Sequence, residues 1–88
     1  MRIRNVINKI LWKYREKLDS YYLVVIDRLN KSGLKRIPFR YVHSVDNYYV
    51  YIISNSDLMA IPIHRVLMIE NVNGETIWSR EKGCKEDF

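Results

Sequence analysis

Hydrophobic residues near the start of the chain recur at three- and four-residue spacing. The apolar positions are Ile3, Val6, Ile7, Ile10, Leu11 and Tyr14. This stripe predicts an amphipathic helix over residues 3–15, with basic and polar side chains on the opposite side. Trp12 lies off the centre of the stripe, so we expect it at the margin between the helix and the sheet.

After Asp19 and Ser20 the pattern changes to runs of β-branched and aromatic residues bounded by turn residues, which predicts strands. Pro38 removes a backbone donor and predicts an edge strand or a bulge. The pair Asn73-Gly74 predicts a type I′ turn, which joins the last two strands and brings Trp78 near Ile69. The predicted strands cover residues 21–29, 35–43, 48–54, 58–61, 65–72 and 75–80.

One helix followed by antiparallel strands predicts an α+β fold. We expect an N-terminal helix packed on a curved antiparallel sheet or small barrel of five to six strands. The 88 residues suffice for one domain with one modest core. We expect this domain to cover residues 1–82 and residues 83–88 to form a short, charged, frayed tail.

The net charge of +5 is distributed unevenly along the chain. Residues 1–40 contain eleven Lys and Arg against three acidic residues, whereas residues 41–88 contain four against seven. A basic half interleaved with aromatic residues such as Trp12 and Tyr22 is typical of a nucleic-acid-binding surface. A solvated helix face that confers solubility is an equally open interpretation.

The composition limits the compartment and the cofactors. Cys84 is the single cysteine, which excludes a disulfide or a cysteine-based metal cluster within one chain and fits a reducing environment. No apolar run approaches the ~20 residues of a membrane span, and Met1–Asn5 does not resemble the start of a signal peptide. We therefore expect a cytoplasmic protein with no membrane contact, metal or other cofactor.

The signatures of common enzymes are missing from the sequence. The three glycines lie far apart, so there is no phosphate loop, and no histidine pair has metal-binding spacing. His43-Ser44-Val45 and His64-Arg65-Val66 do not match the His-x-Ser/Thr motif of two-histidine phosphoesterases. We therefore assign no catalytic residue. A small cyclic phosphodiesterase or ribonuclease that uses His43 and His64 as acid and base is an alternative.

The pair His64-Arg65 is the main candidate for binding chemistry. It interrupts the apolar block Ile61–Val66, where a charged group needs a partner. The planar guanidinium of Arg65 can bond two phosphate oxygens, and His64 can donate one more hydrogen bond. The alternatives are a structural histidine bonded to the backbone and a surface ion pair of Arg65 with Glu70 or Asp57.

Several short motifs together resemble a known family over about residues 3–80. The most specific are Ile61–Val66 and the hairpin that ends in Trp78 and a basic residue, Arg80. Weaker ones are Ile10-Leu11-Trp12, Val25-Ile26-Asp27-Arg28 and Ile37-Pro38. The chain resembles the archaeal RNA cyclic group end recognition domain family.

This resemblance implies a non-catalytic RNA-binding module that recognises RNA 3′ ends with a 2′,3′-cyclic phosphate in RNA processing or repair. His64 and Arg65 match the polar pair of the motif, and Asp27-Arg28 matches the polar end of its first strand. A further alternative is a protein-interaction module that joins an RNA-processing complex, with an RNA-processing enzyme as its partner, through the predicted edge strand at 35–43. The residues expected to bind phosphate and RNA are His64, Arg65, Arg28, Lys35, Arg36 and Arg40.

Overall fold

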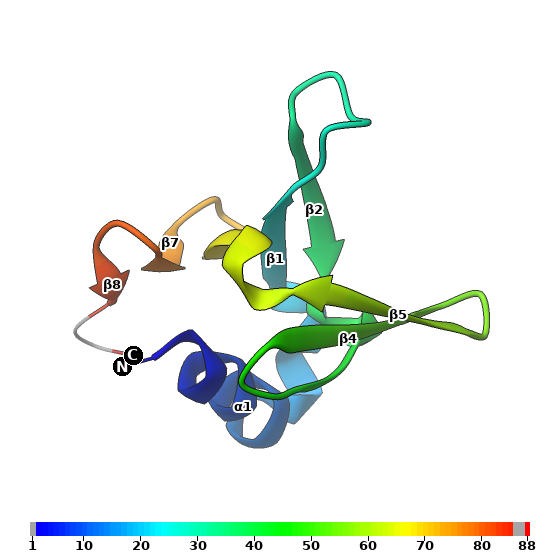
Figure 1. Cartoon of the computed structure of the whole chain (residues 1–88). Coiled ribbons are helices and arrows are strands. Elements are labelled where there is room, and N and C mark those ends of the chain that lie inside the picture. Colours follow the sequence, from blue (N-terminus) through cyan, green and yellow to red (C-terminus); the bar gives the residue numbers. More distant parts are fainter. Residues whose placement is uncertain (1, 86–87) are drawn as a thin grey trace.

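The computed structural model describes residues 2–85 and 88, and in them one α-helix precedes two antiparallel sheets (Figure 1). The predicted α+β class is therefore confirmed. In chain order the elements are α1 (Ile3–Lys13), η1 (Arg15–Ser20), β1 (Tyr21–Ile26), β2 (Leu34–Pro38), η2 (Phe39–Tyr41), β3 (Val42–Val45), β4 (Tyr49–Ser54), β5 (Asp57–Pro62), η3 (Ile63–Arg65), β6 (Val66–Asn71), β7 (Thr76–Ser79) and β8 (Gly83–Cys84), where η denotes a 3₁₀-helix.

The strands form two sheets and no closed barrel. One sheet has the strand order β2-β1-β6-β7-β8, and the other has the order β3-β4-β5. The prediction of a single strand over 35–43 is wrong, because β2 ends at Pro38 and η2 leads the chain into the second sheet. Phe39 in this turn is completely buried, which anchors the crossing in the core. The predicted edge position is confirmed, since β2 is the outermost strand of its sheet.

A single hydrophobic core lies between α1 and both sheets. The helix contributes Val6, Ile7 and Ile10, all fully buried, as the apolar stripe predicted. Both sheets contribute to the same core: Leu23 comes from the five-stranded sheet and Val50 from the three-stranded sheet. Burial of each such side chain stabilises the fold by about 1.5–3 kcal/mol relative to its exposure.

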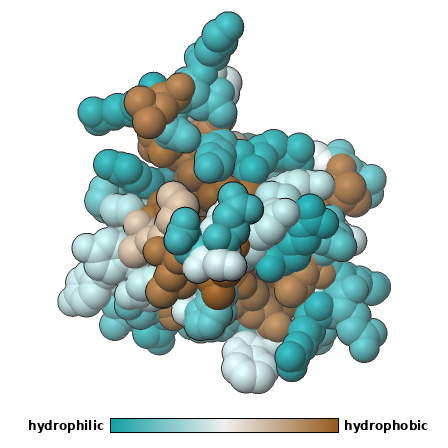
Figure 2. Space-filling model, turned by 90° about the vertical axis from the view of Figure 1, so that its right-hand side faces the viewer, coloured by the Kyte–Doolittle hydropathy of each residue, from teal (hydrophilic) through white to brown (hydrophobic). Residues whose placement is uncertain are grey.

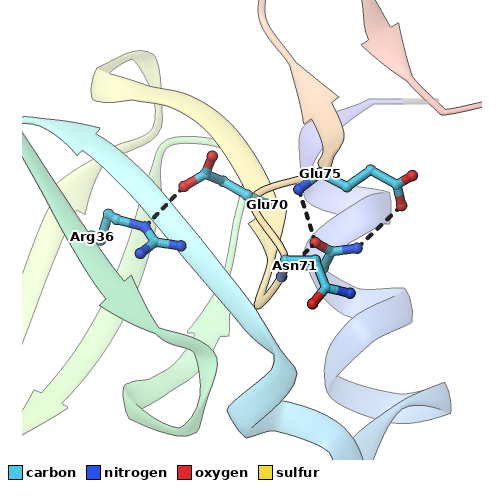
Figure 3. Close-up of polar contacts among 5 residues, drawn as sticks. Arg36, Glu70, Asn71 and Glu75 are labelled. Atoms are coloured by element: carbon cyan, nitrogen blue, oxygen red, sulfur yellow. Dashed lines mark hydrogen bonds and ion pairs between the residues drawn. The ribbon is translucent and has the colours of Figure 1, made fainter.

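The hairpin between β6 and β7 forms with a different turn from the predicted one. Trp78 pairs with Ile69, as predicted. However, Gly74 has a positive φ (82°) and Asn73 does not, so the turn is not type I′. A three-residue loop closes instead, because Asn71 accepts a bond from the Gly74 N–H (3.0 Å) and donates its own N–H to Glu75 (2.9 Å). The Asn71 side chain adds a bond from the Glu75 N–H, shown in Figure 3.

A turn with two positive φ values occurs between β4 and β5. Asn55 (φ 51°) and Ser56 (φ 69°) both adopt the conformation that a two-residue type I′ hairpin requires. They connect Ser54 and Asp57, which are paired across the hairpin. Asn tolerates this conformation better than most residues, and the strong pairing of the two strands holds Ser56 in it.

The structure also differs from the predicted frayed tail. Gly83–Cys84 forms β8 beside β7, and the Lys85 N–H donates to the Ile77 carbonyl (2.7 Å). The Phe88 ring stacks on Tyr14 with centroids 5.3 Å apart, and the Lys9 ammonium donates to the Phe88 carbonyl. The described part of the tail therefore packs on the domain, whereas residues 86–87 lie outside the described residues.

Candidate functional site

His64 and Arg65 lie in the short turn η3, between β5 and β6, and not on a strand. The turn is fixed on two sides. The Arg80 guanidinium donates to the carbonyls of Ile63 (2.9 Å) and Val66 (3.1 Å), and the Ile63 N–H donates to the Tyr48 carbonyl (2.8 Å). Main-chain atoms before and after the His64-Arg65 pair are thus held in place.

Both side chains of the pair are exposed to solvent. Among the residues that the structure describes, no hydrogen bond or ion pair engages either of them. Glu70, one of the partners considered for Arg65, instead bonds Arg36 from β2 at 2.8 Å (Figure 3). His64 is therefore not a structural histidine bonded to the backbone, and its ring and the Arg65 guanidinium are accessible to a ligand.

A hollow of about 410 Å³ adjoins this turn, and we call it the arginine hollow. Arg2, Arg4 and Arg80 line it together with Asn47 and Ile63, the residue before His64. Arg4 is oriented by a hydrogen bond to the Asn47 side-chain oxygen (2.6 Å). No acidic residue belongs to the described lining of this hollow, so it is suited to an anion.

Tyr48 is an exposed aromatic beside the turn that sequence reasoning missed. Its side chain is 73% exposed, although the run that follows it packs in the sheet, with Val50 fully buried. The preceding Asp46 carboxylate accepts hydrogen bonds from the Tyr51 hydroxyl and from the backbone N–H groups of Tyr48 and Tyr49. These bonds lower the pKa of Asp46 below its ordinary value. In the sequence, the turn residues Asp46 and Asn47 directly before Tyr48 could have indicated that this tyrosine precedes the strand.

Two other predicted residues lie toward the same end of the five-stranded sheet. Lys35 pairs with Val25 on one side of β1, and Val25 pairs on its other side with Val66, which follows Arg65. Arg28 is exposed in the turn after β1. The register therefore places Lys35 and Arg28 near the C-terminal end of β1, which is the end close to η3.

The remaining two predicted residues are engaged within the protein. Arg36 bonds Glu70, and its guanidinium lies 4.2 Å from the centroid of the Tyr22 ring. Arg40 lies in η2, at the opposite end of β2, where it is 3.5 Å from the Asp19 carboxylate and donates to the Tyr41 hydroxyl (3.2 Å). The structure does not bring Arg40 together with His64 and Arg65.

Arg40 belongs to a second hollow, of about 730 Å³, which we call the tryptophan hollow. Trp12, Arg15, Tyr41 and His43 also line it. Trp12 is 77% exposed, so the prediction that it lies at the helix–sheet margin is wrong. It follows the buried Ile10 by two residues, a rotation of about 200° around the helix, and therefore points away from the core.

The two histidines do not line the tryptophan hollow together. His43 lines it and accepts or donates a hydrogen bond with the Ser44 hydroxyl (3.0 Å), whereas His64 is not among its lining residues. In the second sheet Val42 pairs with Ile52, while Pro62 pairs with Tyr49. The three residue steps from Tyr49 to Ile52 span about 10 Å of β4.

The β4–β5 hairpin presents a third kind of surface. Ile53, Leu58 and Met59 are exposed there. Figure 2 faces the side toward which this hairpin projects, and brown hydrophobic groups are visible among teal polar ones.

Within residues 2–85 and 88, no cluster of His, Cys, Asp and Glu could hold a metal ion. No helix in the same residues has the length and apolar content needed to cross a membrane.

Residues 1–80 match the family described as the MJ1316 RNA cyclic group end recognition domain. The chain belongs to this family. The resemblance read from the sequence motifs is thereby confirmed.

Relatives in this family come from Sulfolobales archaea and are named UPF0248 proteins. One from Saccharolobus islandicus is 47% identical over 81 residues, which cover 91% of this chain and 100% of the relative. One from Saccharolobus solfataricus is 44% identical over 91% of this chain and 98% of its own length. One from Metallosphaera sedula is 42% identical over 91% of this chain and 94% of its own length. No solved structure matches the chain.

Proposed function

We propose that this protein binds RNA 3′ ends that carry a 2′,3′-cyclic phosphate and does not cleave them. The observation that carries the proposal is the exposed His64-Arg65 pair on a turn fixed by Arg80, beside a hollow lined by three arginines. The family description, recognition of RNA cyclic group ends, names the same ligand chemistry.

The chemistry of the pair suits this ligand. A cyclic phosphate has two free oxygens that share one negative charge, and the planar Arg65 fork can bond both of them. His64 adds one further donor. Hydrogen bonds to charged groups contribute about 1.5–3 kcal/mol each, so the pair alone gives modest affinity. A 3′-hydroxyl end offers no such charge and forgoes these bonds.

Neighbouring residues supply the remaining affinity. Arg2, Arg4 and Arg80 make the arginine hollow attractive to the adjoining phosphates. Tyr48 offers an exposed ring for the terminal base, and stacking of this kind contributes about 1–3 kcal/mol. Arg28 and Lys35 follow the backbone along the β1–β2 side. Arg36 contributes less, because Glu70 and Tyr22 already hold its guanidinium.

The arrangement of the histidines favours binding over catalysis. Acid–base cleavage of one phosphate by His43 and His64 needs both imidazoles within hydrogen-bond reach of that phosphate. His43 lies on β3 beside the middle of β4, whereas His64 follows the end of β5, which pairs with the start of β4 from its other side, and of the two only His43 lines the tryptophan hollow. Incubation with cyclic-ended RNA should leave the end intact, and opening of the ring by water to a terminal 2′- or 3′-phosphate would support the enzyme alternative.

A matched pair of oligonucleotides tests the proposal. The two share one sequence, and one ends in a 2′,3′-cyclic phosphate while the other ends in a 3′-hydroxyl. We expect at least about tenfold tighter binding of the cyclic end, because one charged hydrogen bond corresponds to that factor. Binding should also weaken steeply with salt through counterion release. Equal affinity for both ends would reduce the function to general RNA binding.

A further inference from the structure

The tryptophan hollow contains an exposed aromatic ring that the fold itself does not use. The other face of α1 packs in the core, but Trp12 projects into solvent with 77% of its surface exposed. Tyr41 lines the same hollow and is partly exposed. Large flat rings that remain accessible beside a concavity are suited to stacking on a nucleobase, since every base has a π-face.

The charges around this ring suit the phosphate of a nucleotide. Arg15, Arg40 and His43 line the hollow, and no acidic residue belongs to its described lining. Asp19 lies 3.5 Å from Arg40, and both side chains are mostly exposed. Exposed ion pairs of this kind are weak, so an incoming phosphate can share the Arg40 guanidinium.

One side of α1 connects the tryptophan hollow with the arginine hollow. Arg4, Asn8 and Trp12 follow one another at four-residue spacing, which places them on one side of the helix. Arg4 lines the arginine hollow, whereas Asn8 and Trp12 line the tryptophan hollow. The eight residue steps from Arg4 to Trp12 rise about 12 Å along the axis. A few nucleotides of an extended strand span that distance.

We propose that the tryptophan hollow binds an upstream nucleotide of the same RNA strand. Its base stacks on Trp12, its phosphate lies between Arg15 and Arg40, and the strand runs along the Arg4-Asn8 side of α1. The position of the RNA end at η3 rests on the proposed function above. The nucleotide-binding chemistry of the hollow does not depend on that position.

Fluorescence titration of the intact chain tests this proposal, because Trp12 is exposed whereas Trp78, the other tryptophan, is buried. The probes are a cyclic-ended dinucleotide, a cyclic-ended RNA of about six nucleotides, and the same longer RNA with a 3′-hydroxyl. Trp78 lines the arginine hollow, so its emission can respond to the RNA end, and the Trp12 signal is taken as the difference between wild type and Trp12→Phe. Both longer RNAs should quench this Trp12 signal, while the dinucleotide should leave it nearly unchanged.

Substitutions separate the hollow from the rest of the surface. Trp12→Ala and Arg15→Ala should each weaken binding of the longer RNAs about tenfold, within the usual range for loss of a stacked base or a phosphate contact. Neither should change binding of the dinucleotide. Trp12→Phe, which retains an aromatic face, should lose less. The controls are Leu58→Ala, an exposed hydrophobic residue of β5, and Lys82→Ala, an exposed basic residue of the β7–β8 turn.

The outcomes distinguish this inference from the proposed function. Wild-type affinity of Trp12→Ala and Arg15→Ala for the longer RNAs would overturn the inference even if the cyclic end is preferred. Conversely, if both ends bind equally while Trp12→Ala still weakens binding of the longer RNAs, the inference holds and the proposed end recognition fails.

Discussion

The arginine hollow and the tryptophan hollow lie toward opposite ends of α1 and differ in how the fold holds them. The arginine hollow adjoins η3, which hydrogen bonds from Arg80 hold in place, and positively charged side chains line it. The second centres on an exposed ring where the helix ends and the irregular η1 begins, with Lys17 in a non-helical conformation. Fixed donors suit a small charged end group, whereas an exposed ring suits any base. The two proposals therefore assign end recognition and strand binding to separate regions of one small domain.

The largest expected effect concerns the core beneath the tryptophan hollow. Phe39 is fully buried and belongs to η2, which carries Arg40 and Tyr41 into this hollow. Phe39→Ala should lower the free energy of unfolding by about 3–5 kcal/mol, measured by urea denaturation. Tyr41→Ala, at a partly exposed position of the same turn, should cost much less. Equal losses would contradict the assignment of Phe39 as the anchor of η2.

The next effect concerns η3, the turn beside the arginine hollow. Arg65→Ala should weaken binding of a cyclic-ended RNA by about 1.5–3 kcal/mol, since it removes a charged two-point contact. Arg15→Ala should leave binding of a cyclic-ended dinucleotide unchanged. Isothermal titration at one salt concentration compares the two variants. If Arg15→Ala weakens dinucleotide binding as much as Arg65→Ala does, the two regions are not separable.

Arg80→Ala tests whether the turn is held in advance. The substitution removes the guanidinium bonds to the Ile63 and Val66 carbonyls and should cost about 1.5 kcal/mol of folding stability. It should also weaken cyclic-end binding, because His64 and Arg65 lose their fixed position. Amide hydrogen exchange at residues 63–66 should accelerate in the variant. Unchanged exchange there would show that the turn does not depend on Arg80.

A smaller effect is expected for the ion pair between Arg36 and Glu70. The Arg36 side chain is half exposed, and such pairs contribute about 0–1 kcal/mol. Arg36→Ala should therefore change stability slightly and affect RNA affinity less than Lys35→Ala does. Chemical denaturation and RNA titration of both variants provide the measurements. A larger loss of affinity for Arg36→Ala would restore Arg36 as a principal RNA contact.

The smallest effect should be visible only as a dependence on pH. The bond from the Tyr51 hydroxyl and the backbone bonds of Tyr48 and Tyr49 hold the pKa of Asp46 below its ordinary 3.8. A carboxylate with a depressed folded pKa stabilises the fold above its unfolded pKa, and this contribution is lost as pH falls through the folded pKa. The stability difference between wild type and Asp46→Asn should thus be constant near neutral pH and shrink below 3.8. A difference that persists in strong acid would contradict this role.

The sequence predicted features that depend on local pattern. The stripe Val6-Ile7-Ile10 predicted the buried face of α1, and Trp78 was expected beside Ile69. The split of 35–43 into two sheets was not predicted, because alternation continues through Pro38 and Phe39 although the chain crosses between sheets. Local pattern reports which side of an element is apolar, but it does not report which sheet an element joins.

The candidate site was predictable only in part for the same reason. His64-Arg65 stands out because charge interrupts an apolar block, whereas its exposure follows from η3, a 3₁₀ turn that the sequence did not predict, since the predicted strand began at Arg65. The tryptophan hollow combines Trp12 with Arg40 and His43, which lie far from it in the chain and reach it through the crossing at η2. A site assembled by topology leaves no motif in the sequence.

The most direct test of the central claim combines a change in the protein with a change in the RNA end. Wild type, Trp12→Ala and the double variant His64→Ala/Arg65→Ala are each titrated with the cyclic-ended and the 3′-hydroxyl oligonucleotide. We expect a cyclic-end preference of at least about tenfold in wild type and in Trp12→Ala. The double variant should bind both ends equally. An unchanged preference in the double variant would contradict recognition of the cyclic end by His64 and Arg65.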